Sequence, residues 1–316
     1  MPVRSRLLFA ATALSFAAAS TFTQSAPPSQ NADPNAITIT VTPVVKGDSA
    51  PPQITQADVV VRQGNKERPV IAWEPANPSD PKLDLVIVVD DSLTNAVATH
   101  WNEVASFLDS LPAGARTAVA YANRGAIQLA QQPTADHSLT AKALRNPAGV
   151  VVQDASIYES VQALVHGWPS RPGRKVILVV SGGYDSKFPG SVWDDWPTMQ
   201  KAIEEAQRKS VVVYSIYAKP FTPAPLNQAQ LEWGQQALNF LSLATGGQSF
   251  YSLGFENAPS FEPYLQKIQR ELAQQYLLTF QVDPGAKPGP SMIHIAAANK
   301  AAQLRSQARV FVPPAK

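Results

Sequence analysis

Cysteine is absent from this chain of 316 residues. Its absence excludes disulfide bonds, zinc–thiolate sites, iron–sulfur clusters, a cysteine nucleophile and a lipid anchor on an N-terminal cysteine. Charge is also scarce, because Lys, Arg, Asp and Glu make up 16% of the residues, against about a quarter in ordinary soluble proteins. The formal net charge of +2 is too small for bulk electrostatic binding to nucleic acid or an anionic membrane. We therefore expect no nucleic-acid partner.

Hydrophobic residues are sufficient for a packed core, at 45% of the chain. A chain of this length and composition is globular and forms one large domain or two ordinary ones. Proline is dense, with 28 residues where average usage would give about 16. Proline-rich stretches are therefore useful markers of boundaries.

The N-terminus has the pattern of a secretory signal peptide. Arg4 and Arg6 precede an apolar run over residues 7–20 that ends in small residues. The alternative is a membrane anchor, but the run is shorter than the ~20 residues of a spanning helix. We predict cleavage within residues 20–26, which removes two arginines and leaves 24 basic against 24 acidic residues. The mature chain is expected to be secreted or periplasmic, with no membrane span.

Strands are predicted at both ends of the mature chain. Strict alternation over Ile37–Thr42 predicts a half-buried strand. Apolar segments at residues 59–62 and 70–73 flank Gly64 and predict a hairpin. Further strands are expected at 276–282, 292–295 and 310–312, with residues 283–290 as a loop.

The middle of the chain alternates buried strands with amphipathic helices. Residues 83–89, 175–180 and 211–217 are apolar runs, typical of parallel strands covered on both faces. This order predicts an α/β fold with a doubly wound, mostly parallel sheet, and a small β-subdomain made from the N- and C-terminal strands. The expected segments are a signal peptide at 1–25, a linker at 26–36, a β-extension at 37–82, the α/β domain at 83–275 and a second β-extension at 276–316.

Three oxygen-bearing side chains follow the first buried strand. Asp90, Ser92 and Thr94 are spaced by two residues on the turn into a helix. Ligands of open α/β sheets bind at this edge, and these side chains are hard ligands suited to Mg²⁺ or Ca²⁺.

At this point the sequence resembles the von Willebrand factor type A (VWA) domain, and more closely the exported bacterial variety with β-extensions. The resemblance spans residues 83–275 and rests on Asp90-x-Ser92-x-Thr94, on the strand and glycines of residues 174–183, and on Ala-Thr-Gly-Gly at 244–247. It implies a domain that binds other proteins through a metal-ion-dependent adhesion site built from three loops.

Two ligands that this resemblance implies are missing. The second-loop threonine is expected near Ala155 and the third-loop aspartate at Gly182. Asp154 or Asp185 would have to replace them for Mg²⁺ to bind. The resemblance therefore favours a degraded metal site, with a rebuilt Mg²⁺ site as the alternative.

Ordinary structural roles compete with the metal hypothesis. Ser92 or Thr94 can cap the following helix. Ser156 with Glu159 has the spacing of a capping box, which we favour over a metal role. Asp185 can shape a turn.

An aromatic loop follows the second buried strand. Tyr184, Phe188 and Trp193 are expected at the ligand-binding edge and are candidate contacts for a partner protein. Trp196 is expected to pack onto its own helix.

No enzyme motif is present. The nucleophile elbow, the phosphate loop and the dinucleotide-binding glycine motif are all missing, and the four histidines have no metal-pair spacing. The sequence favours an exported, non-enzymatic module that binds another protein. A hydrolase that uses the same cleft is the remaining alternative.

Overall fold

The computed structural model describes residues 35–45, 51–149, 156–188, 191–221, 226–252, 257–298 and 302–314. The predicted signal peptide, Asp154 and Ala155 lie outside these residues. All described residues belong to one compact unit of the chain, which begins at Pro34.

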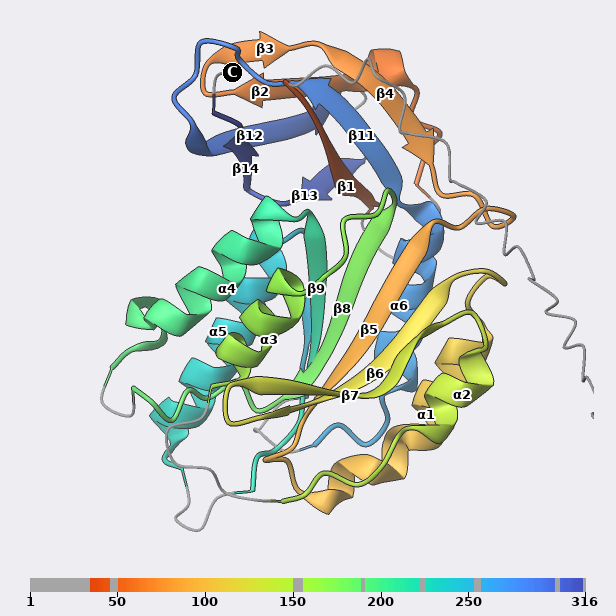
Figure 1. The fold of residues 1–316 in the computed structure, drawn as a ribbon, viewed down its shortest axis with the longest axis vertical. Helices are drawn as coiled ribbons and strands as arrows, with labels where there is room; N and C mark the ends of the chain where they lie inside the picture. Colours follow the sequence, from red (N-terminus) through yellow and green to blue (C-terminus); the bar gives the residue numbers. More distant parts are fainter. Residues whose placement is uncertain are drawn as a thin grey trace, which may run out of the picture. The chain divides into compact units, whose positions relative to one another are not determined.

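A six-stranded sheet forms the centre of this unit (Figure 1). Its order is β10-β9-β8-β5-β6-β7, and every neighbouring pair is parallel except β6 and β7. This order confirms the predicted doubly wound, mostly parallel α/β sheet. The strands are β5 (Leu83–Asp90), β6 (Arg116–Asn123), β7 (Ala126–Thr134), β8 (Arg174–Ser181), β9 (Val211–Tyr217) and β10 (Ser249–Phe250).

Helices cover both faces of the central sheet, as Figure 1 shows. The helices form two groups, one on each face of the sheet. An apolar core lies between each group and the sheet. The uninterrupted apolar runs of β5, β8 and β9 are required because both faces are buried. The first group is α1 (Trp101–Asp109), α2 (His137–Lys142) and α6 (Glu262–Gln274), and the second is α3 (Ile157–His166), α4 (Pro197–Arg208) and α5 (Gln228–Ala244).

The first and last described segments of the chain form a β-subdomain, as predicted. Its two four-stranded sheets have the orders β13-β1-β11-β4 and β14-β12-β2-β3, and they share a third apolar core. The strands are β1 (Ala36–Val44), β2 (Val59–Gln63), β3 (Lys66–Arg68), β4 (Val70–Pro75), β11 (Tyr276–Gln281), β12 (Gly289–Ala297), β13 (Gln303–Ser306) and β14 (Arg309–Val312).

The pairing of β1 with β11 joins the N- and C-terminal segments. Six residues of β1, from Ala36 to Val41, pair antiparallel with β11. This confirms the prediction that the first strand pairs with the strands beyond Tyr276. The predicted linker is one residue too long, since Ala36 already belongs to β1.

The predicted hairpin around Gly64 is wrong in its second strand. β2 pairs with β3, while β4 pairs with β11 in the other sheet. Pro69 separates β3 from β4 and has no N–H for a ladder, so the chain can cross between the sheets there. Trp73 of β4 then stacks on Tyr276 of β11 with ring centroids 4.2 Å apart. The predicted loop at 283–290 ends two residues early, because β12 begins at Gly289.

Arg174 holds the start of β8 against the segments that lead into and out of the central sheet. Its guanidinium is buried and donates to the carbonyl oxygens of Pro81 and Leu272 and to Oε1 of Gln275. Burial lowers the pKa of Arg174 to about 10, so the side chain remains charged at neutral pH. A buried cation needs such partners.

Removing β11 to β14 is predicted to destabilise the protein. A chain that ends at Gln275 leaves β1 and β4 without β11 and exposes the third core, so it should aggregate or melt well below the full-length chain. Thermal unfolding followed by circular dichroism measures this. A chain that ends at Val312 keeps every strand and is the control. Equal melting temperatures for all three chains would contradict a shared β-subdomain.

Candidate functional site

Asp90 ends β5 at the carboxyl edge of the central sheet, and its carboxylate is bonded by hydroxyl groups. Oδ1 accepts hydrogen bonds from Ser92 Oγ at 2.6 Å and Ser92 N at 3.0 Å. Oδ2 accepts one from Ser181 Oγ, also at 2.6 Å. Burial raises the pKa of Asp90, and the bonds from Ser181 and Ser92 partly oppose this. Asp90 thereby links the ends of β5 and β8.

Thr94 does not join Asp90 and Ser92. It precedes the short 3-10 helix η2 (Asn95–His100), but its side chain makes no capping bond. Its backbone N–H donates to the carbonyl of Lys219 at 3.3 Å. Phe221 N likewise donates to Ser92 O at 2.7 Å. The segment after β9 is thus bonded to the loop after β5.

Gly182 is covered by this same segment. A Cβ atom placed on Gly182 would lie 2.7 Å from Cδ of Pro220, far inside van der Waals contact. Gly182 is the position where the resemblance to VWA domains implies an aspartate. In this conformation Pro220 occupies the space of any side chain there.

Asp185 lies two residues beyond the Gly182–Gly183 turn and is fully buried. Its Oδ2 accepts hydrogen bonds from Ser156 Oγ at 2.8 Å and from Thr198 Oγ1. Its Oδ1 accepts one from Lys187 N at 3.0 Å. Burial raises the pKa of Asp185, and the hydroxyl bonds partly offset this.

The predicted capping box of Ser156 and Glu159 is wrong. Ser156 is at the N-cap of α3, but its side chain makes no capping bond and is instead directed at Asp185, to which it donates. Glu159 pairs with Lys187 at 2.7 Å instead. Sequence analysis also missed Ser181, although a hydroxyl at the end of a buried strand beside β5 was a usable signal.

The loop after β8 is pressed against α5. Gly183 has φ +71°, and a Cβ on it would overlap the carbonyl of Gly234 in α5. A Cβ on Gly234 would in turn overlap the carbonyl of Gly182. Tyr158 supports the loop from the other side, where its buried hydroxyl donates to Gly183 O at 2.6 Å. Two glycines are therefore needed to seat this loop on the helix.

Asp91 points away from Asp90 and has a separate role. It forms a bidentate ion pair with Arg145, with nitrogen–oxygen distances of 2.8 and 3.0 Å. The Arg145 guanidinium lies 3.6 Å from the centre of the Tyr121 ring, and Ala148 N also donates to Asp91. This cluster fixes the segment 145–149 to the sheet.

The aromatic residues predicted to contact a partner are half-buried and pack on the second core. Tyr184 accepts a hydrogen bond from Gln230 at 2.9 Å. The Trp193 ring lies 5.3 Å from that of Phe240. Trp196 is fully buried. Three apolar residues near Trp193 are more exposed than these aromatic residues. We define them as the apolar patch: Val192, Phe240 and Leu243, which are 39–47% exposed.

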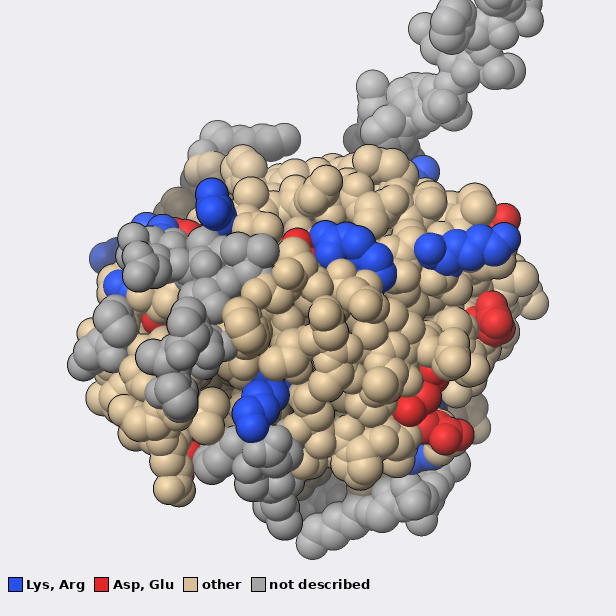
Figure 2. Space-filling view, turned by 90° about the horizontal axis from the view of Figure 1, so that it is seen from below, with Lys and Arg blue, Asp and Glu red and all other residues tan. Residues whose placement is uncertain are grey.

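Few charged side chains surround this edge of the sheet. Figure 2 views the molecule from that side, and most of the described residues on this face are uncharged. Among the described residues, no three His, Cys, Asp or Glu side chains are grouped closely enough to hold a metal ion. Within the same residues, no helix has the length and apolar character needed to cross a membrane.

Replacing Gly234 by alanine is predicted to destabilise the fold by about 1–3 kcal/mol, the usual cost of overpacking, because the new methyl group overlaps the Gly182 carbonyl. Urea unfolding measures this. Gln236→Ala, at an exposed position of the same helix, is the control and should change stability by less than about 0.5 kcal/mol. A neutral Gly234→Ala would mean that loop and helix are not in this close contact.

Neither a protein-family model nor a curated protein sequence matches this chain. Among solved structures, an aerotolerance-related membrane protein from Bacteroides fragilis is similar at 10% identity with a TM-score of 0.43, covering 60% of this chain and 98% of that one. A von Willebrand factor type A protein from Catenulispora acidiphila is similar at 11% identity with a TM-score of 0.40, covering 79% and 75%. The VWA domain of SpRpn10 is similar at 13% identity with a TM-score of 0.39, covering 59% and 94%.

Proposed function

We propose that this chain is an exported, non-enzymatic interaction module of the VWA type that binds another protein without a metal ion. The observation that carries the proposal is the contact of Pro220 with Gly182. The Pro220 ring fills the space where a metal site of this kind needs its second carboxylate.

The remaining side chains fit Mg²⁺ poorly. Mg²⁺ requires near-octahedral geometry and one or two well-placed carboxylates. Both oxygens of Asp90 accept hydrogen bonds from Ser92 and Ser181. Asp185 is buried with three donors of its own and would lose them by turning toward a cation.

The absence of enzymatic activity is supported by the surroundings of the histidines. In the described ranges, no histidine is hydrogen-bonded to a serine or threonine hydroxyl. His100 contacts Glu103, His137 contacts the carbonyl of Ala115, and His166 contacts Glu205. A hydroxyl nucleophile needs an adjacent base.

Turnover of chromogenic esters or phosphates that is lost in Ser92→Ala would contradict the absence of enzymatic activity.

Export is proposed from Arg4, Arg6 and the apolar run over residues 7–20. N-terminal sequencing of the exported chain should find a first residue between 21 and 27. A chain that retains the apolar run would contradict cleavage.

Divalent metals are predicted not to stabilise the protein. A ligand that binds only the native state at 100 times its Kd adds about 2.7 kcal/mol, which a thermal melt detects. We expect equal melting temperatures in Mg²⁺, Mn²⁺ and chelator. The matched variant is Asp90→Asn. A metal-dependent rise in the wild type that Asp90→Asn lacks would establish the alternative, a rebuilt Mg²⁺ site.

Partner binding is predicted to depend on aromatic residues rather than on Asp90. Once a partner has been isolated by crosslinking outside the cytoplasm, Trp193→Ala and Phe240→Ala should each weaken binding by ~2 kcal/mol or more, equally with and without Mg²⁺. Asp90→Asn should lower stability instead, because an amide cannot accept all three hydrogen bonds. The control is Leu139→Ala, since Leu139 is exposed on α2. If only Asp90→Asn lost partner affinity, and only in the presence of Mg²⁺, Asp90 rather than the aromatic residues would carry partner binding.

A further inference from the structure

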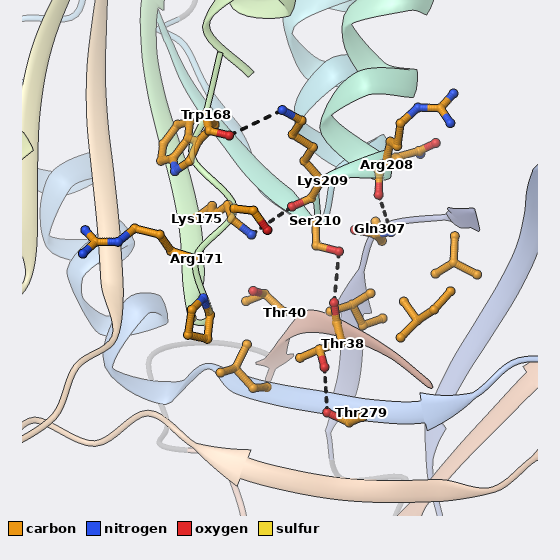
Figure 3. A pocket seen from close by; sticks show the side chains of 18 of the residues that line it. Thr38, Thr40, Trp168, Arg171, Lys175, Arg208, Lys209, Ser210, Thr279 and Gln307 are labelled. Atoms are coloured by element: carbon orange, nitrogen blue, oxygen red, sulfur yellow. Dashed lines mark hydrogen bonds between the residues drawn. The ribbon is translucent and has the colours of Figure 1, made fainter. Parts of the chain in front are cut away.

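A cleft of roughly 650 Å³ lies at the opposite end of the central sheet from Asp90. Residues 36–40 of β1 and two residues of β11 line one side. Residues 168–173 and the end of α4 line the other (Figure 3). The cleft is therefore bounded by both the α/β domain and the β-subdomain. Its volume is in the range of small-molecule sites.

Positive charge dominates the lining of this cleft. Its charged residues are five cations and one carboxylate, namely Lys82, Arg171, Lys175, Arg208, Lys209 and Glu74. Such an excess is notable in a chain with a formal net charge of only +2. A lining of one sign attracts ligands of the other sign.

Three of these cations form no close ion pair in the part of the chain that the structure describes. Lys82 pairs with Asp80 at 3.4 Å and Arg208 with Glu204 at 3.0 Å. In the described part of the chain, no carboxylate lies within ion-pair distance of Arg171, Lys175 or Lys209. Asp84, which does not line the cleft and pairs with Arg116 at 3.8 Å, acts on Arg171 and Lys175 from a longer distance, so it balances their charge only in part.

Lys175 lies deeper in the protein than the exposed Arg171. It is half-buried, and its ammonium donates to the backbone carbonyl of Lys209 at 3.3 Å. Burial lowers the pKa of Lys175, and the charge of Lys209 lowers it further, while Asp84 acts in the opposite direction. The ammonium of Lys209 is directed at the carbonyls of His166 and Trp168, as Figure 3 shows for Trp168. An anion beside Lys175 would compensate for the solvation that its ammonium loses on burial.

Thr40 offers a hydrogen-bonding group to this cleft. It is 4% exposed and lines the cleft, yet its hydroxyl has no hydrogen-bond partner among the described residues. Nearby hydroxyls are bonded, since Ser210 donates to Thr38 O at 3.0 Å and Thr38 bonds to Thr279 at 2.8 Å. The Thr40 hydroxyl is not one of the buried atoms that lack a partner, so it is accessible from the cleft and can bond to a ligand oxygen there.

We propose that this cleft binds a small oxyanion ligand, with Lys175 and Arg171 as its cationic contacts and Thr40 as a hydrogen-bond donor. The ligand carries at least two negative charges on oxygen, as in a phosphate ester, a pyrophosphate or a polycarboxylate. Because the cleft lies between two parts of the fold, the bound ligand also links β1 to β8. This proposal is independent of the metal site and of the partner surface.

The test is calorimetric titration of the complete mature chain with pyrophosphate and, separately, with citrate, at matched ionic strength. Saturable one-to-one binding of at least one probe is expected, and the stronger probe distinguishes phosphate from carboxylate ligands. Lys175→Gln and Arg171→Gln should each weaken binding at least ~10-fold. Arg171 is exposed, so its variant folds even if Lys175→Gln does not. Lys201→Gln, an exposed position on α4, is the charge-matched control and should bind as the wild type does.

Thr40→Val separates ligand binding from structure. Losing an unpartnered hydroxyl should leave the melting temperature of the free protein equal or higher, while affinity falls about fivefold. The proposal is overturned if neither probe saturates, if Lys201→Gln loses as much affinity as Lys175→Gln, or if Thr40→Val binds with wild-type affinity.

Discussion

Close contact between the loop after β8 and the backbone of α5 is the constraint on which the candidate site depends. Neither Gly183 nor Gly234 has room for a Cβ atom, so the loop lies against the helix. With the loop in that position, Pro220 covers Gly182 and the Ser181 hydroxyl reaches Asp90. The lack of room for a side chain at residue 182 and the hydroxyl network around Asp90 therefore belong to one packing arrangement.

The fold could be predicted from the sequence where burial imposes a simple pattern. Strands covered on both faces must be apolar throughout, and β5, β8 and β9 lie where such runs occur. The pairing of β1 with β11 was predictable because an isolated edge strand needs a partner. The pairing of β4 with β11 was not predictable from the sequence, because local turn signals do not reveal which of two sheets a strand joins. Only the stacking of Trp73 on Tyr276 and the break at Pro69 account for it.

The site was less predictable because its contacts join residues far apart in sequence. Asp90 and Ser92 are neighbours and were readily identified, but Asp185 accepts hydrogen bonds from Ser156 and Thr198, which are 29 and 13 residues away. A capping box is a local rule, and it failed at Ser156 because the side chain is oriented by its hydrogen bond to the distant, buried carboxylate of Asp185. Charge-assisted bonds of this kind are about twice as strong as neutral ones.

An acidic residue at position 90 has a structural purpose even where no cation binds. Its two oxygens accept three hydrogen bonds from groups that belong to two different strand ends. Asparagine offers one acceptor oxygen and two donors, so it would confront one serine hydroxyl with an N–H. Alanine would leave both hydroxyls and a backbone N–H unsatisfied in a largely apolar setting. The carboxylate that a metal site would use is thus also the group that best connects β5 to β8. An aspartate at this position is therefore, by itself, no sign of metal binding.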